Sequence, residues 1–260
     1  MKAKKSYGQH FLTSEEIAEQ IADGLQLKGA YEKVLEIGPG QGMLTKYLLE
    51  KDYKLLVVEA DDDMVFYLKK HFPQLKGFII DADFLKLDLN LFFKNQPFAI
   101  IGNFPYNISS QILFKMLEYK SQIPELVGMF QREVAERVVS GPGSKVYGVI
   151  SVLVQAFYSG ELLLNVDRSF FNPPPKVQSA VIRLIRKENQ NLGCDENLFR
   201  QVVKQAFGQR RKMLRNTMKS YLMGDALLED KFFTQRPEEL SVENFVTLTN
   251  WIEKRASKND

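Results

Sequence analysis

The segment NFPY combines residue types that can hold a planar amine. Asn103, Phe104, Pro105 and Tyr106 follow an apolar run, residues 98–101, that has the composition of a buried strand. Pro105 fixes its own φ and keeps the residue before it extended, so the amide of Asn103 and the carbonyl of Phe104 or Pro105 can converge on one amine. The ring of Tyr106 offers a stacking face. An ordinary Asn-Pro type of turn is the alternative, but these four residues at a strand end favour an amine-binding loop.

A glycine-rich turn lies earlier in the chain. Gly38, Gly40 and Gly42 follow the apolar segment 33–37, and a helical pattern comes next. A strand, a glycine turn and a helix begin a nucleotide-binding crossover. The spacing differs from G-x-G-x-x-G, and no Walker lysine follows, which disfavours a dinucleotide enzyme, a kinase or a nucleoside triphosphatase. Glu36 would repel a pyrophosphate, whereas it suits a cationic ligand or a structural contact to the loop.

Two carboxylates follow at the ends of the next apolar segments. Glu59 ends the run KLLVVE, 17 residues after Gly42, where a carboxylate can hold a ribose diol. Asp83 follows a short strand and can accept from an adenine amino group, with Phe84 as a flat apolar neighbour. Taken singly, each acid could be a surface or turn residue. Together with the glycine loop, they predict a site for an adenosine ligand without polyphosphate, and S-adenosylmethionine, with its positive sulfonium, fits beside Glu36.

The elements that must position these residues alternate between apolar strands and amphipathic helices. This order predicts a parallel sheet whose carboxyl edge collects the polar residues. Thr13 or Ser14 can cap a first helix, and the segments on either side of Pro173 to Pro175 form two strands with a stiff connection.

Bulk properties exclude several classes of protein. The chain has 260 residues, a formal net charge of +3, two histidines and one cysteine, Cys194. A zinc site and an internal disulfide are therefore not expected, and we predict no metal. No apolar run is long enough to span a membrane and no signal peptide is visible, so a cytoplasmic location is expected.

The composition changes near residue 187, which predicts a domain over 1–187 and a small helical domain over 188–260. Between residues 198 and 222 the chain carries seven Lys and Arg residues and no acid. A run of one sign predicts a surface that faces phosphates. The candidate RNA-binding residues are Arg210, Arg211, Lys212 and Arg215.

The motifs EIGPGQG, DADF and NFPY, with Glu59 between the first two, resemble in order those of S-adenosylmethionine-dependent methyltransferases. GQHFL, NFPYNISS, FNPPPKVQSAV and FGQRRKMLRN narrow the resemblance to the ribosomal RNA small-subunit adenine dimethyltransferase family (KsgA/RsmA type). The resemblance covers nearly the whole chain. His10 stands where the family usually has asparagine, and Phe104 where it usually has leucine.

The resemblance implies a Rossmann-like α/β fold, with a mostly parallel sheet of seven strands whose last strand is antiparallel, and a small C-terminal α-helical domain. It implies dimethylation of the N6 amines of two adjacent adenosines near the 3′ end of small-subunit (16S) rRNA, with a role in small-subunit maturation. The implied partner is this rRNA in a 30S precursor, without a membrane, and the implied protein is a monomer that converts S-adenosyl-L-methionine to S-adenosylhomocysteine.

The implied site consists of residues from several motifs. The catalytic loop is Asn103, Phe104, Pro105 and Tyr106, and the target base would stack between Tyr106 and Phe171. The expected cofactor-binding residues are His10, Leu12, Gly38, Gly40, Glu59, Asp83 and Asn103.

Four other functions are weighed against this one. A large-subunit rRNA dimethyltransferase of the antibiotic-resistance type is disfavoured by FGQRRKMLRN, and a DNA adenine methyltransferase by the lack of a separate base-recognition domain. A mainly non-catalytic assembly factor is disfavoured by the intact motifs. An NAD-dependent oxidoreductase is disfavoured by the glycine spacing.

Overall fold

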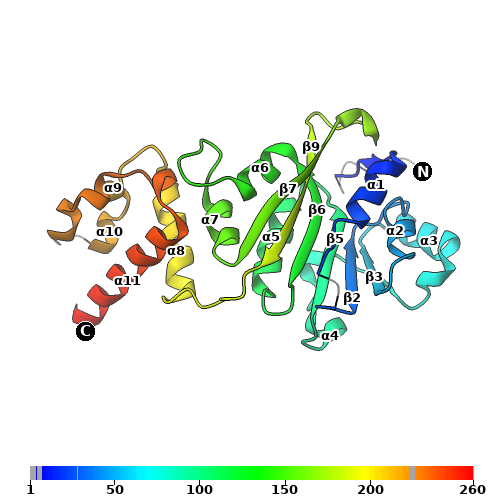
Figure 1. Ribbon diagram of the computed structural model, residues 1–260, viewed down its shortest axis with the longest axis horizontal. Coiled ribbons are helices and arrows are strands. Elements are labelled where there is room, and N and C mark those ends of the chain that lie inside the picture. Colours follow the sequence, from blue (N-terminus) through cyan, green and yellow to red (C-terminus); the bar gives the residue numbers. More distant parts are fainter. Residues whose placement is uncertain (1–3, 5–7, 28, 223–225, 260) are drawn as a thin grey trace. The chain divides into compact units, whose positions relative to one another are not determined.

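The computed structural model describes residues 4, 8–27, 29–222 and 226–259. Its main feature is a seven-stranded sheet in the order β4-β3-β2-β5-β6-β9-β7 (Figure 1). The strands are β2 (Lys33–Ile37), β3 (Lys54–Glu59), β4 (Ile79–Asp81), β5 (Phe98–Asn103), β6 (Glu125–Gln131), β7 (Tyr158–Val166) and β9 (Ser179–Arg186). Strands β4, β3, β2, β5 and β6 pair in parallel, and β9 runs antiparallel to β6. The predicted sheet, mostly parallel with an antiparallel last strand, is therefore confirmed.

Helices of the first part of the chain precede the large sheet or lie between its strands in sequence. They are α1 (Glu15–Ala22), α2 (Thr45–Leu48), α3 (Asp62–His71), α4 (Asn90–Phe93) and α5 (Ser109–Glu118). Helix α1 begins where the sequence predicted it, since the Ser14 side chain accepts from the backbone N–H of Ile17. Ile17 and Ile21 of this helix join an apolar core with sheet residues such as Val127. Burial of this face holds α1 close to the sheet.

The parallel register brings the ends of the central strands to one edge of the sheet. Glu36 pairs with Val57 on one side and with Ile101 on the other, and Glu59 pairs with Asp81. The polar residues that follow these strands therefore meet at the carboxyl edge, where open parallel sheets bind ligands.

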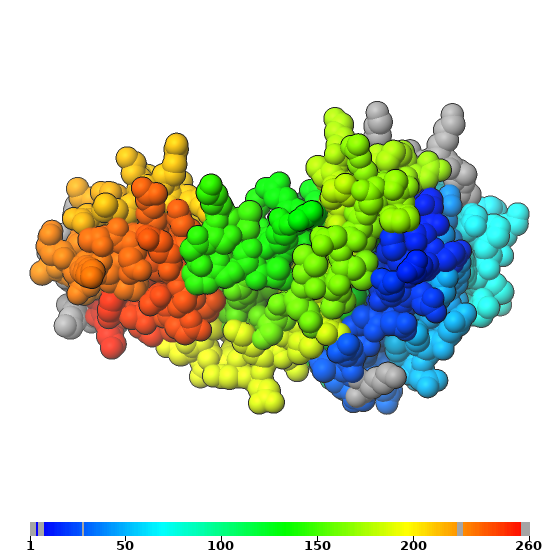
Figure 2. Space-filling model, turned by 45° about the horizontal axis from the view of Figure 1, so that its top comes forward, coloured from blue at the N-terminus to red at the C-terminus, as the bar shows by residue number. Residues whose placement is uncertain are grey.

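A small second sheet ties the N-terminal segment to this edge. Strand β1 (Phe11–Leu12) pairs antiparallel with β8 (Phe171–Asn172), which lies in the connection between β7 and β9. On the surface, the blue N-terminal segment and the yellow-green connection lie beside each other (Figure 2). Residues far apart in sequence thus frame one region.

The chain forms two compact units, 1–135 with 159–186, and 136–158 with 187–260. The second unit contains the second half of α6 (Arg132–Val139), together with α7 (Val149–Gln155), α8 (Glu196–Gly208), α9 (Leu214–Thr217), α10 (Lys219–Leu222) and α11 (Val242–Asn259). Segment 136–158 thus groups with the C-terminal residues, unlike in the predicted division at 187. The cause is long-range packing: α7 contacts α8, and the ring of Tyr147 meets that of Phe207 at 6.2 Å.

Among the described residues, none of the helices has both the length and the apolar character needed to cross a membrane.

Candidate active site

A cavity of about 730 Å³ opens at the carboxyl edge of the sheet. Its walls come from the N-terminal segment, the glycine turn and the loops after β3, β4 and β5. It brings together ten of the residues predicted from sequence: His10, Leu12, Gly38, Gly40, Glu59, Asp83, Asn103, Phe104, Pro105 and Tyr106. These ten side chains or backbones therefore line a single space, although the chain separates them by up to 96 positions.

The glycine turn is closely covered by aromatic rings. Gly40 has a φ of +56°, and a Cβ there would lie 2.9 Å from Cε1 of Phe11. Gly42 has a φ of +79°, and a Cβ there would lie 2.4 Å from the ring of Phe72. Both positions thus need glycine for conformation and for space. Phe72, which also lines the cavity, carries no motif and was not singled out from the sequence.

Glu59 presents a carboxylate that the backbone holds in place. Its Oε1 accepts from the N–H groups of Ala60 (2.9 Å) and Asp61 (3.0 Å), and its Oε2 accepts from Gly40 (3.1 Å). Burial raises the pKa of this carboxyl, and the three backbone hydrogen bonds oppose that rise. Each carboxylate oxygen can accept more than one bond, so Glu59 retains capacity for a ligand hydroxyl in the cavity.

Asp83 lies at the start of a short 3-10 helix, Phe84–Lys86, which it caps by accepting from the N–H of Leu85 at 3.0 Å. The ring of Phe84 is buried and belongs to the cavity wall. The ammonium of Lys115 on α5 donates to the carbonyls of Leu85 (2.9 Å) and Leu87 (2.5 Å). This buried lysine, which was not singled out from the sequence, therefore fixes the loop that carries Asp83.

Glu36 is buried and makes a structural contact. From the sequence, such a contact was one of two options, the other being a cationic ligand. Its Oε2 accepts from Thr45 Oγ1 at 2.7 Å, which ties β2 to the helix after the glycine turn. Burial raises the pKa of this carboxyl to about 8; the Thr45 bond opposes the rise and the nearby Glu59 charge adds to it. Glu36 also lines the cavity, and a cationic ligand there would favour its carboxylate form and lower its pKa.

The side chain of Asn103 is oriented by the N-terminal segment. Its Nδ2 donates to the carbonyl of His10 at 3.0 Å, which leaves Oδ1 as the acceptor. The carbonyl of Pro105 accepts from the N–H of Ile108 at 3.1 Å within the turn. Phe104 O is therefore the better candidate for the second acceptor of an amine.

The ring of Tyr106 is held from two sides. Its hydroxyl shares a hydrogen bond with Oγ of the buried Ser179, at the start of β9. Its ring lies 5.3 Å from the His10 ring, tilted by 32°. Burial raises the pKa of the Tyr106 phenol, and the Ser179 bond opposes that rise. Ser179 was missed from sequence, although it ends the segment FNPPPKVQS that the resemblance marked.

His10 connects the loop of residues 103–106 to the proline-rich connection between β7 and β9. Its Nδ1 lies 2.8 Å from the carbonyl oxygen of Pro173, at hydrogen-bond distance. Its own carbonyl accepts from Asn103. The histidine therefore fits where the family usually has asparagine, because its ring reaches a backbone acceptor.

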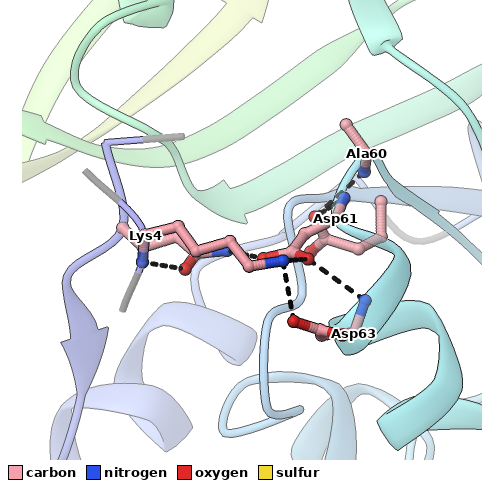
Figure 3. A network of polar contacts seen from close by, with 6 residues as sticks. Lys4, Ala60, Asp61 and Asp63 are labelled. Atoms are coloured by element: carbon pink, nitrogen blue, oxygen red, sulfur yellow. Dashed lines mark hydrogen bonds and ion pairs between the residues drawn. The ribbon is translucent and has the colours of Figure 1, made fainter. Parts of the chain in front are cut away.

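The N-terminal segment is also bonded to the residues that follow β3 (Figure 3). Lys4 Nζ bonds Asp61 Oδ1 at 2.5 Å and Asp63 Oδ2 at 2.7 Å, and Gln9 Nε2 donates to Asp61 Oδ2 at 2.8 Å. Burial acts to raise the pKa of Asp61, but the bonds from Lys4 and Gln9 outweigh it and lower the pKa. Lys4 and Gln9 are thus held at Asp61, two residues after Glu59.

The predicted stacking role of Phe171 needs correction. Its side chain is only 3% exposed and packs in the apolar core, and it does not line the cavity. The reason is the β1–β8 pair, which places Phe171 opposite Leu12. A base could not lie against this ring without opening that pair.

The basic run divides into two kinds of side chain. Arg211 and Lys212 are exposed in the turn after α8. Arg210 instead donates to the carbonyl of Ser144 at 3.2 Å and lies 3.9 Å from Glu238, and Arg215 is half-buried with a buried Nε. Of the four predicted RNA-binding residues, Arg210 is therefore bonded within its own unit, Arg215 is partly buried, and Arg211 and Lys212 are exposed. In the described part of the chain, no group of three or more His, Cys, Asp or Glu residues is placed to hold a metal.

Comparisons with known proteins agree with this geometry. The family model described as "Ribosomal RNA adenine dimethylase" matches residues 1–254. The chain is 57% identical over 253 residues to the ribosomal RNA small subunit methyltransferase A of Flavobacterium johnsoniae, covering 97% of each chain. It is 53% identical over 255 residues to the protein of the same name from Bacteroides thetaiotaomicron, covering 98% of this chain and 95% of that one.

A solved structure extends the agreement to the fold. The crystal structure of a dimethyladenosine transferase from Plasmodium falciparum matches with a TM-score of 0.79 and 26% identity, covering 95% of this chain and 98% of that one. A match of this extent includes the sheet and the C-terminal helices alike. The chain belongs to the ribosomal RNA adenine dimethylase family.

Proposed function

We propose that this protein transfers methyl groups from S-adenosylmethionine to the N6 amines of two adjacent adenosines near the 3′ end of small-subunit rRNA, two methyl groups to each amine. The relatives at 57% and 53% identity are named small-subunit methyltransferases, which supports this substrate over large-subunit RNA. Above all, Asn103 lies on the wall of the cavity with its Nδ2 already bonded to His10 O, so that its Oδ1 is the group left to accept from an amine.

The residues around the cavity suit S-adenosylmethionine. Glu59 would accept from the ribose hydroxyls, Asp83 from the adenine amine, and Phe84 would contact the adenine face. Gly38 and Gly40, which have no Cβ, would let the backbone approach the ligand closely. The N-terminal segment, with His10 and Leu12, would cover it. When bound, the cofactor supplies an electrophilic methyl group.

The amine of adenine is a poor nucleophile because its lone pair is delocalised into the ring. Asn103 Oδ1 and the carbonyl oxygen of Phe104 would accept hydrogen bonds from its two N–H groups and favour a pyramidal nitrogen. The same two oxygens would stabilise the positive charge that develops on this nitrogen, an electrostatic effect that preorganised groups provide. Tyr106 would stack against the base, which must leave its helix or come from a loop to reach the cavity. No general base is required, because the methylated ammonium can lose its proton to water.

The two parts of the chain would divide the work. We assign cofactor binding and catalysis to the residues up to 187, and RNA binding to the helical residues from 188 onward, with Arg211 and Lys212 as its exposed cations. The substrate particle would be a precursor of the 30S subunit, on which the protein would act as a monomer in the cytoplasm. None of the proposed steps uses a metal.

Mass spectrometry of nucleosides tests this proposal. Small subunits lacking the modification, large subunits and protein-free rRNA are incubated with the protein and isotopically labelled S-adenosylmethionine. We expect labelled N6,N6-dimethyladenosine in the small-subunit RNA, at two adjacent positions, and a much slower appearance of the label after the change Asn103→Ala. Label in the large subunit alone would establish the antibiotic-resistance type of activity. Cofactor binding without labelled nucleoside in any sample would establish a non-catalytic role.

A further inference from the structure

A second hollow, of about 780 Å³, lies on the connection between β7 and β9. It is formed by the 3-10 helix that spans Arg168–Phe170 and by the proline-rich residues that follow. The lining residues are Asp167, Arg168, Ser169, Pro174, Pro175, Lys176 and Gln178. None of them belongs to the wall of the first cavity.

The connection is bonded to the catalytic loop and its neighbours at three points. Pro173 O lies 2.8 Å from Nδ1 of His10, and Phe170 O accepts from the N–H of Thr13 at 2.8 Å. Ser179, directly after Gln178, shares its hydrogen bond with the hydroxyl of Tyr106. The hollow is therefore held at a set position beside the residues that would receive the target base.

The charge of the hollow is predominantly positive. Arg168 and Lys176 are exposed on its lining, against one acid, Asp167. The carboxylate of Asp167 accepts from the N–H of Ser169 and from Nε2 of Gln178, both at 2.8 Å. A hydrogen bond from the Ser169 side chain contributes most to lowering the pKa of Asp167 to about 2, and the bonds from the Ser169 N–H and from Gln178 add to it. Asp167 thus braces the two walls of the hollow.

Two large apolar side chains stand out from the same connection. Phe170, the last residue of the 3-10 helix, is 42% exposed, and Val177 is 44% exposed. Exposed aromatic rings next to cations are typical of surfaces that bind single-stranded RNA, where rings contact bases and cations contact phosphates.

We propose that this hollow binds the phosphate–ribose backbone of the RNA nucleotides that flank the target adenosine. Arg168 and Lys176 would each contact a phosphate, and the exposed ring of Phe170 would lie against a neighbouring base or sugar. Contacts of this kind set the register of the strand without reading its sequence. The hollow would therefore deliver whichever adenosine stands at the right distance from the bound phosphates. This assignment rests on the proposed RNA substrate.

Binding of an RNA hairpin that contains the two target adenosines tests the assignment. The variant Arg168→Gln/Lys176→Gln is compared with Lys54→Gln/Lys94→Gln, a matched change of two exposed lysines at the amino-terminal side of β3 and β5. Fluorescence anisotropy over a series of salt concentrations gives the salt dependence of binding. Loss of two phosphate contacts to single-stranded RNA should lower the slope by about 1.4 units. The control should retain the wild-type slope.

Single methylphosphonate linkages on either side of the target adenosines locate the contact. Neutralising the phosphate that the hollow binds should weaken binding to the wild type and leave binding to Arg168→Gln/Lys176→Gln unchanged. Titration calorimetry with S-adenosylhomocysteine should give the same affinity for both proteins, because the cofactor cavity is intact.

An unchanged salt slope in the double variant overturns the assignment. So does a variant that binds the hairpin normally but loses activity on small subunits, since the hollow would then contact a ribosomal protein. Failure of the wild type to methylate RNA would refute the proposed function instead. The binding measurements do not depend on turnover and decide the role of the hollow separately.

Discussion

The ring of Phe104 occupies the space that a side chain at Gly128 would need. A Cβ at Gly128 would lie 2.1 Å from Cε2 of Phe104, and a Cβ at Gly102 would lie 2.8 Å from Cε1 of the same ring. Gly102 and Gly128 are paired neighbours on β5 and β6, and the ring of Phe130 meets that of Phe104 at 5.0 Å. The loop of residues 103–106 is thus held in place by a buried ring, for which Gly102 and Gly128 leave space.

Gly128→Ala should therefore push the Phe104 ring out of its space and displace the loop of residues 103–106. Overpacking of this kind costs about 1–3 kcal/mol of the free energy of unfolding, and it should displace the backbone of Phe104 and lower turnover. The second change Phe104→Leu, which removes the ring and restores the usual residue of the family, should recover most of both losses. Urea unfolding and methylation of small-subunit RNA measure the two effects. A double variant as impaired as Gly128→Ala alone would contradict this account of the packing.

Asn103→Ala should lower turnover by at least ~10²-fold, as the loss of a preorganised polar group in a transition state does. The affinity for S-adenosylhomocysteine should change little, because Glu59 and Asp83 remain in place. Single-turnover methylation and titration calorimetry separate these quantities. The change also removes the bond to His10 O, so a melting curve is needed to establish that the variant is folded. Near-normal turnover in a folded variant would refute the role of the amide.

The bond between Tyr106 and Ser179 predicts a coupled pair of effects. Tyr106→Phe keeps the stacking ring but removes its anchor, and Ser179→Ala removes the other partner. If the bond orients the ring, each single change should raise the KM for RNA, and the double variant should lose little more than either single one. Tyr106→Ala should lose more, since stacking of a base on an aromatic ring contributes about 1–3 kcal/mol. Additive effects of the first two changes would indicate that the hydroxyls act independently.

Arg211 and Lys212 should differ from Arg210 in what their substitution changes. Arg211→Glu/Lys212→Glu should weaken RNA binding and flatten its salt dependence, because both side chains are exposed. Arg210→Ala should chiefly lower the stability, by about 1 kcal/mol, since it removes the hydrogen bond to Ser144. Anisotropy titrations and urea unfolding of the same proteins measure both effects. If Arg210→Ala changed the salt dependence of RNA binding and Arg211→Glu/Lys212→Glu did not, Arg210 would be the residue that contacts RNA.

Sequence reasoning succeeded where local pattern determines structure. Strand ends after apolar runs located Glu59, Asp83 and Asn103, because the carboxyl ends of parallel strands meet at one edge. It failed where a side chain depends on residues distant in the chain. Phe171 is buried by its pairing with Leu12, and Ser179 reaches Tyr106 across 73 positions.

The departure at Phe104 shows the same limit. From the sequence, phenylalanine in place of leucine at position 104 could be interpreted only as a larger apolar side chain in the loop. The space for its ring comes from Gly128 on the adjacent strand, and neither residue predicts the other without the register of β5 and β6. Likewise, the run of basic residues around Arg210 did not reveal that Arg210 itself is bonded to Ser144, a partner 66 positions earlier.

Glu36 should make the stability of the protein depend on pH. Burial raises the pKa of its carboxyl to about 8 in the folded state, above the ordinary value of 4.5 that the unfolded chain would have. Its contribution is therefore fully present below pH 4.5 and is lost as the pH rises toward 8, with a slope of up to about 1.4 kcal/mol per pH unit. Glu36→Gln cannot ionise, and its amide oxygen can still accept from Thr45. The variant should gain stability relative to the wild type between pH 5 and pH 8, measured by urea unfolding. Because every other titrating group is shared, a difference that stays constant over this range would mean that Glu36 titrates at its ordinary value in the folded protein.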